Sequence, residues 1–411
     1  MPLIYIVFFL FCLLFVKSKR RKFDVSCYIY MIYLVCAICF GIVYYGYPKS
    51  IQFPERITLT SVSAHLLLLS IFFFPFVHYS SKLDFTRFQI SDKGLKIFEW
   101  CLIVPSIAAI FVSSADVIRI VAFGDYSVAR TAYLEGDIDA GYISRYGLLG
   151  YIMSFGPQTC FLSVTMFFYS FFYKGDKKMG LLMFIASFAL VIQNLSIAGR
   201  EGFIRWMLYF GFNFVLFRDH VSYKGHRSFW ILIALGVSIM LFFFRAISID
   251  RFEDSTYGTL YSLFSYAGQP FYYFSYAFNE FATKNISGFG SIFTIVTGNE
   301  VKRAVDNLSL DFALNTFPTF VGSFIAKVGF WRTLLLGSVW CIVLSYIFSR
   351  KRSMSFSSAV TYIIFYDVIL FGVLYFIHYP RFTQITMVVY IIVAWVISTL
   401  YSKKFIKNSK V

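Results

Sequence analysis

Arginine side chains near the ends of apolar runs are the residues of this sequence best suited to binding an anion. Arg200 and Arg205 lie where one apolar run begins, Arg245 follows Phe242 to Phe244 at the end of another, and Arg251 comes shortly after it. A guanidinium group stays protonated and binds two phosphate oxygens at once. We therefore expect these side chains to converge on a diphosphate group. Further candidates for substrate binding are Arg303, Arg381 and Asn315.

A second set of residues is suited to accepting a proton beside such an anion. Carboxylates and histidine act as general bases when they lie within hydrogen-bonding reach of the reacting hydroxyl. The candidates are Glu253, Glu300, Asp306 and His378. They are not accompanied by a His/Cys cluster with metal-ligand spacing. We therefore expect a site that uses neither a metal nor a cofactor.

The composition indicates that a membrane-embedded fold positions these residues. Of the 411 residues, 59% are hydrophobic, 22% are aromatic and only 14% are charged. Apolar runs of about 15 to 25 residues match a hydrocarbon layer of about 30 Å crossed by helices that rise 1.5 Å per residue. Lipid cannot satisfy the backbone groups of isolated strands. The sequence therefore predicts an all-α, polytopic helix bundle with residues 1–411 in one integral membrane domain.

The net charge of +16 follows the predicted topology and does not indicate nucleic-acid binding. The connections predicted on one side hold 22 of the 37 lysines and arginines but only six of the 21 acidic residues. Cytoplasmic loops of membrane proteins carry this excess of positive charge. The first apolar run is followed by Lys17 to Lys22 and preceded by no basic residue. We therefore expect the N-terminus outside and the C-terminus in the cytoplasm.

About eleven spans follow from this pattern, with one long outer segment at 250–327. The outer segment contains most of the candidate site residues, and that is why we expect the chemistry there. The predicted spans are 2–16, 25–47, 59–79, 97–118, 146–172, 179–198, 202–217, 229–249, 328–348, 357–379 and 383–401.

Residues 257–281 within the outer segment are apolar and aromatic but contain Gly268 and Pro270. Counting them as a span would place the basic run Arg350–Arg352 outside. We therefore interpret this stretch as a broken or interfacial helix pair that lies across the outer mouth of the bundle. Its tyrosines are suited to stacking on sugars and equally to an aromatic belt at the membrane interface.

Each charged residue inside the apolar runs can have one of two structural roles. Glu201 and Arg205 are four residues apart, so on a helix they share a face and can pair. They either line a cavity or extend to the interface from a helix end. Asp367 lies near the middle of a predicted span, where a charge costs about 3 kcal/mol. It is either a proton-coupling group or a protonated carboxyl that Tyr362 or Tyr366 satisfies.

Three short motifs resemble the Wzy-type polymerases of bacterial O-antigen and capsular polysaccharide, also called oligosaccharide repeat unit polymerases. The segment 198–203 resembles the Gly-Arg start of a mid-chain helix in that family, and 315–317 resembles its Asn-Thr-Phe stretch. Residues 327–329 resemble a later step, although Lys327 and Val328 replace the usual acidic-aromatic pair. The resemblance covers roughly residues 140 to 350.

The resemblance implies a glycosyltransferase of the bacterial cytoplasmic membrane that joins repeat units carried on undecaprenyl diphosphate. The implied partners are these lipid-linked units, the bilayer and a chain-length regulator protein, with no nucleic acid. A lipid-linked oligosaccharide flippase is the main alternative, because Asp367 would suit proton coupling. An O-antigen ligase is a closer relative of the polymerases and stays open beside it.

The topology gives the first testable prediction. In a background with the native cysteines replaced, Ser287→Cys should react with a membrane-impermeant maleimide in intact cells, because residue 287 is predicted outside. Ser409→Cys, in the basic C-terminal tail, should react only after the cells are permeabilised. Labelling of position 409 in intact cells would contradict the predicted orientation.

Overall fold

The computed structural model of the protein is helical. It describes residues 1–51, 54–84, 88, 90–123, 147–197, 199, 201–221, 227, 231, 234–235, 238, 258–281, 318–349, 354–374 and 381–401. Within these ranges the chain forms helices and no β-strand. The predicted all-α class is therefore confirmed for this part of the chain.

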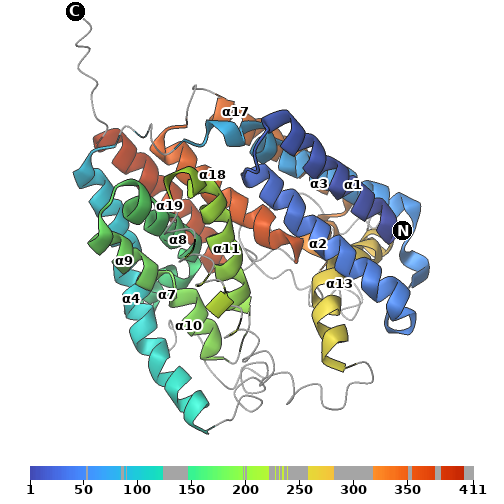
Figure 1. Ribbon diagram of the computed structural model, residues 1–411, viewed down its shortest axis with the longest axis horizontal. Helices are drawn as coiled ribbons and strands as arrows, with labels where there is room; N and C mark the ends of the chain where they lie inside the picture. Colours follow the sequence, from blue (N-terminus) through green and yellow to red (C-terminus); the bar gives the residue numbers. More distant parts are fainter. Residues whose placement is uncertain are drawn as a thin grey trace, which may run out of the picture. The chain divides into compact units, whose positions relative to one another are not determined.

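The helices follow one another in the order that Figure 1 labels. The α-helices are α1 (Pro2–Arg20), α2 (Val25–Gly46), α3 (Leu59–Tyr79), α4 (Asp92–Phe123), α7 (Leu148–Gln158), α8 (Cys160–Phe168), α9 (Lys177–Ala186), α10 (Ala189–Leu195), α11 (Glu201–Phe217), α13 (Gly258–Phe281), α16 (Thr319–Val328), α17 (Phe330–Ser349), α18 (Phe356–Leu370) and α19 (Arg381–Leu400). Single turns lie at η1 (Pro48–Ser50), η2 (Pro54–Arg56), η3 (Ser80–Lys82), η6 (Arg218–His220) and η7 (Phe371–Val373), and η5 (Tyr169–Tyr173) is a π-helix.

Seven helices in the described ranges are long and apolar enough to cross a membrane. This supports a multi-pass membrane protein, while the predicted number of eleven spans stays a prediction. Residues 229–249, the eighth predicted span, fall almost entirely outside the described residues. The seven are Pro2–Arg20, Val25–Gly46, Leu59–Lys82, Asp92–Arg119, Lys177–Leu195, Phe330–Ser349 and Phe356–Val373.

The predicted span 146–172 is interrupted near its middle. Helix α7 ends at Gln158 and α8 begins at Cys160, because Pro157 lacks the N–H that would continue the helical pattern. Just before the break, Gly156 packs against the backbone of α4, where an added Cβ would lie 2.6 Å from Ser106 Cα. The glycine therefore lets α7 approach α4 at the point where the helix breaks.

The chain divides into two compact units, described separately here. Unit 1 comprises Met1–Ser80, Phe210–Tyr346 and Phe365–Gln384. Unit 2 comprises Ser81–Tyr209, Ile347–Ile364 and Ile385–Val411.

The core of unit 1 is built from aromatic rings around Phe271 of α13. The Phe271 ring lies 4.6 Å from that of Tyr5 in α1 and is stacked 6.1 Å from that of Phe40 in α2. All three rings are fully buried. Figure 1 shows α13 beside α2, and Gly268 makes this approach possible, because an added Cβ would lie 2.6 Å from the backbone nitrogen of Phe40.

Helix α13 differs from the sequence prediction. The described stretch is one continuous helix from Gly258 to Phe281 with Pro270 inside it, and the predicted break into a helix pair is wrong for these residues. The packing of Gly268 and Phe271 on α1 and α2 holds the helix together through the proline. Helix α13 is not among the seven candidate spans.

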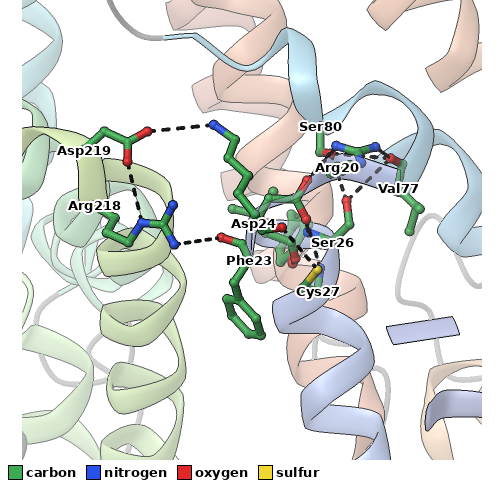
Figure 2. Close-up of polar contacts among 12 residues, drawn as sticks. Arg20, Phe23, Asp24, Ser26, Cys27, Val77, Ser80, Arg218 and Asp219 are labelled. Atoms are coloured by element: carbon green, nitrogen blue, oxygen red, sulfur yellow. Dashed lines mark hydrogen bonds and ion pairs between the residues drawn. The ribbon is translucent and has the colours of Figure 1, made fainter. Parts of the chain in front are cut away.

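A polar cluster lies at one end of unit 1, where α1 joins α2 (Figure 2). Asp24 caps α2 by accepting hydrogen bonds from the Ser26 and Cys27 backbone nitrogens. Arg20 donates to Asp24 at 2.6 Å, and also to the Val77 carbonyl oxygen in the last turn of α3 and to the Ser80 hydroxyl directly after that helix. These contacts tie the end of α3 to the α1–α2 connection.

Residues after α11 reach the same cluster. Arg218 donates to the Phe23 carbonyl oxygen at 3.4 Å, and Lys22 lies 3.8 Å from Asp219. Three connections that the sequence predicts on one side of the membrane, 17–24, 80–99 and 218–227, thus contribute residues to a single end of unit 1.

Unit 2 packs α4 against α7, α9 and α10, and polar contacts join its helices. The Trp206 indole N–H donates to the Ser187 hydroxyl at 2.9 Å, and the Tyr390 hydroxyl donates to the Cys101 carbonyl oxygen at 2.7 Å. Ser170, in the π-helix η5, donates to the buried carboxylate of Glu99 in α4. Each contact satisfies a polar group that the apolar surroundings would otherwise leave without a partner.

A buried histidine joins three helices in unit 1. The His65 ring of α3 is hydrogen-bonded through Nδ1 to the Tyr5 hydroxyl at 2.9 Å and through Nε2 to the Thr319 hydroxyl at 3.1 Å. It also stacks on Phe274 with 3.8 Å between ring centroids. Thr319 adopts a φ of 63°, which is costly for a β-branched residue, and its backbone N–H donates to the Leu374 carbonyl oxygen at 2.9 Å.

This arrangement predicts that His65 is important for stability. His65→Ala should lower the free energy of unfolding by about 2–4 kcal/mol, because it removes the partner of the buried Tyr5 hydroxyl, one partner of the Thr319 hydroxyl and the ring that stacks on Phe274. Thermal unfolding of the purified protein in detergent measures the effect. The matched control is His78→Ala, which changes an exposed histidine near the end of the same helix and should leave the unfolding midpoint within a degree or two of wild type.

Candidate functional site

Most of the residues that the sequence predicts for the site lie outside the described residues. This holds for the candidate bases Glu253, Glu300, Asp306 and His378, and for Arg200, Arg245, Arg251, Arg303 and Asn315. Arg381 is the first residue of α19, and its side chain is not among those described. Of the predicted set, the structure describes only the side chain of Arg205.

Arg205 is buried on α11 in unit 2, and its own helix supplies partners for it. Its Nε donates to the Tyr209 hydroxyl at 2.7 Å, and Nη1 lies 3.7 Å from Glu201 Oε1. The guanidinium carbon lies 5.6 Å from the centre of the Tyr209 ring, which in turn stacks on Phe161 at 4.5 Å. Glu201 and Arg205 thus pair as their spacing predicts, and Tyr209 is a third member that the sequence analysis missed.

The glycines beside this pair have a packing role. An added Cβ at Gly202 would lie 2.6 Å from the Leu190 carbonyl oxygen and 2.8 Å from Asn194 Nδ2. At Gly199 it would lie 3.1 Å from the Asn194 carbonyl oxygen, which also accepts a hydrogen bond from the Gly199 backbone N–H. Gly202 needs glycine because α10 and the start of α11 lie in close contact there.

A second group of residues lies where α13 meets the α2–α3 connection in unit 1. Near the beginning of α13, the Tyr261 ring lies 5.2 Å from that of Tyr47, directly after α2. Near its end, Glu280 pairs with Arg56, just before α3, at 2.6 Å. Both ends of α13 therefore lie beside the same connection, which the sequence predicts on the outer side.

Tyrosines are numerous along this part of unit 1. Ring contacts join Tyr44 with Tyr45 and Tyr272 with Tyr273 at 5.2 and 4.5 Å. Tyr45 and Tyr266 are 60% and 41% exposed. Exposed aromatic rings on the predicted outer side suit both stacking on sugars and an interfacial belt.

Sequence analysis missed the Arg56–Glu280 pair. It gave no role to either residue. The partner is 224 residues away in the chain, so no helical spacing relates the two. The available signal was that both are charged residues predicted on the outer side and flanked by apolar runs.

Two buried carboxylates lie in helices that are long enough to span the membrane. Glu99, which the sequence analysis did not single out, is 2% exposed, and Asp367 is 4% exposed. Tyr366, a proposed partner of Asp367, donates its hydroxyl hydrogen to the Val25 carbonyl oxygen at 2.5 Å. The hydroxyl hydrogen of Tyr366 is therefore used by a backbone carbonyl oxygen.

Comparison with protein families, curated proteins and solved structures gives no match to this chain. Within the described ranges, histidine, cysteine and acidic side chains form no group of three or more that could hold a metal ion. The seven long apolar helices of the described part indicate a class, the helical multi-pass membrane proteins. Polar groups approach each other at both ends of unit 1 and at the start of α11.

The contacts of Arg205 give a testable prediction. Tyr209→Phe should lower the free energy of unfolding by about 1–3 kcal/mol, because the buried guanidinium loses a hydrogen-bond acceptor. Thermal unfolding in detergent measures this, and Tyr45→Phe is the control because Tyr45 is exposed. An unchanged unfolding midpoint in Tyr209→Phe would show that the Arg205–Tyr209 contact contributes little to the fold.

Proposed function

We propose that this chain is a glycosyltransferase that joins undecaprenyl-diphosphate-linked oligosaccharide repeat units at the outer face of a bacterial cytoplasmic membrane. The observation that carries the proposal is the position of α13. This helix belongs to the predicted outer segment, and both of its ends lie beside the α2–α3 connection, together with tyrosines and an arginine–carboxylate pair. The three motifs at 198–203, 315–317 and 327–329 support the same family.

In the proposed reaction, a hydroxyl group of the acceptor sugar attacks the anomeric carbon of the donor glycan. The bond from that carbon to the diphosphate oxygen breaks, and the polyprenyl diphosphate leaves with the electron pair. Arg200 and Arg245 stabilise the negative charge that develops on it. The hydroxyl proton passes to a base drawn from Glu253, Glu300, Asp306 and His378.

The proposed orientation places the N-terminus outside and the C-terminus in the cytoplasm. The excess of lysine and arginine in connections 17–24, 80–99 and 218–227 supports it. In this orientation the Arg20–Asp24 cluster faces the cytoplasm and the Arg56–Glu280 pair faces outward. A chain-length regulator protein is a further proposed partner.

A lipid-linked oligosaccharide flippase is the second candidate, and buried carboxylates favour it. Glu99 and Asp367 lie in candidate spans, and ionisable groups at such positions serve proton relays in transporters. The two functions differ in what accumulates when the protein is missing. Loss of a polymerase leaves single repeat units at the cell surface, whereas loss of a flippase strands lipid-linked units on the cytoplasmic side.

A strain that lacks the gene tests the proposal directly. We expect its surface glycan to consist of single repeat units, measured by electrophoresis and mass spectrometry of the extracted polysaccharide. Lipid-linked repeat units confined to the cytoplasmic side would contradict the polymerase and support the flippase. Polymer of normal length that is not transferred to its final acceptor would support a ligase.

In the complemented strain, Arg200→Lys and Arg245→Lys should each shorten the glycan towards one repeat unit. Lysine keeps the charge but loses the paired hydrogen bonds, which should cost about 2–4 kcal/mol, or about 30- to 1000-fold in rate. Arg352→Lys, in a predicted cytoplasmic basic run, is the control and should leave chain length unchanged. Full-length polymer from both variants at normal protein abundance would refute this assignment of the diphosphate site.

A further inference from the structure

Helix α1 has one face packed within unit 1. On this face Tyr5, Phe9 and Val16 are buried. Arg20, four residues after Val16, lies on the same side of the helix and donates to Asp24 in the polar cluster of Figure 2. The inward side of α1 therefore has its packing and its hydrogen bonds inside the protein.

The opposite face of α1 is open and apolar. Leu10 and Leu14 are 42% and 55% exposed, and Phe11 and Phe15 are 66% and 57% exposed. The two phenylalanine rings stack on each other with 6.1 Å between their centroids. Because α1 is one of the seven candidate membrane spans, the neighbours that suit this open face are the acyl chains of lipids.

Exposed cations lie at the end of this open face. Steps of three and four residues bring side chains to one side of a helix. Lys17 therefore continues the stripe of Leu10 and Leu14. Lys19 continues the stripe of the two stacked phenylalanines, and both lysines are exposed. Arg21, also exposed, follows the last residue of α1 and ends the helix in a left-handed conformation with a φ of 55°.

The charge at this end of α1 is not balanced by carboxylates. Within the described ranges no acidic side chain forms an ion pair with Lys17, Lys19 or Arg21. The nearest acidic residue in the sequence, Asp24, pairs with Arg20 and caps α2. Three cations this close together repel one another, and an anion bound between them removes that repulsion. Phosphate oxygens suit both the ammonium groups and the guanidinium fork.

We propose that the end of α1 binds an anionic phospholipid, whose phosphate headgroup is held by Lys17, Lys19 and Arg21 while its acyl chains lie along the open apolar face. A lipid matches both parts of this surface, because it joins an anionic head to apolar chains. Basic segments directly beside a membrane span attract anionic lipids in this way. The inference concerns the bilayer and does not depend on the proposed glycan chemistry.

Native mass spectrometry of the purified, full-length protein in a charge-neutral detergent tests the proposal. The protein is titrated with phosphatidylglycerol and, separately, with phosphatidylcholine that has the same acyl chains. We expect wild type to bind its first phosphatidylglycerol about tenfold more tightly than phosphatidylcholine. The combined variant Lys17→Gln, Lys19→Gln and Arg21→Gln should bind both lipids equally. The variant Lys17→Arg, Lys19→Arg and Arg21→Lys keeps the charges and should keep the preference.

The matched control removes three exposed lysines from unit 2 through Lys93→Gln, Lys177→Gln and Lys178→Gln. Each of these lysines lies within two positions of an acidic residue, Asp92 or Asp176, so its charge is partly balanced locally. The control should therefore keep the wild-type preference for phosphatidylglycerol. All the substituted side chains are exposed, and each variant should unfold at the wild-type midpoint.

Several results would overturn the proposal. Wild type could bind both lipids equally, the glutamine variant of α1 could keep the preference, or the control variant could lose it. Displacement of phosphatidylglycerol by an excess of soluble glycerol phosphate would also count against it, because the basic end would then bind without the apolar face. A dimer mass that excludes the lipid would show instead that the open face of α1 binds a second copy of the chain.

Discussion

The structure depends on the scarcity of hydrogen-bond partners in the interior of a membrane. Backbone groups there must pair within their own segment, so the apolar runs form helices. Buried side chains are under the same constraint, and His65 meets it with Tyr5 on one ring nitrogen and Thr319 on the other. A single polar side chain thereby fixes α1, α3 and α16 to each other, because any other arrangement would leave buried groups unpaired.

The same constraint explains where unit 1 has its charged residues. Arg20, Asp24 and Ser80 gather at one end, and Arg56 and Glu280 meet at the α2–α3 connection, each charge with a partner within hydrogen-bonding distance. Between them the core is made of aromatic rings such as Phe40 and Phe271. Rings provide the apolar packing that lipid alone does not favour, and their edges and faces set how closely the helices approach.

Function in such a protein requires polar chemistry next to apolar helices, and α13 offers a way to combine them. One face of the helix supplies Phe271 and Phe274 to the core, while its last turn carries Asn279 and Glu280 to the surface. The packing of Phe271 and Phe274 in the core determines where Asn279 and Glu280 lie. Glu280 is thereby held in a fixed position beside Arg56.

The sequence by itself determined the helical membrane class, because long apolar runs in lipid must satisfy their own backbone groups and therefore form helices. Periodicity also related Glu201 to Arg205, since both lie on one helix. Only the tertiary structure decided that α13 is continuous through Pro270, because packing against Phe40 outweighs the missing hydrogen bond. It alone also brought Arg56 to Glu280 and His65 to Thr319. Each pair joins residues that are more than 200 positions apart in the sequence. Their contact is therefore set by how the helices pack and not by any local sequence pattern.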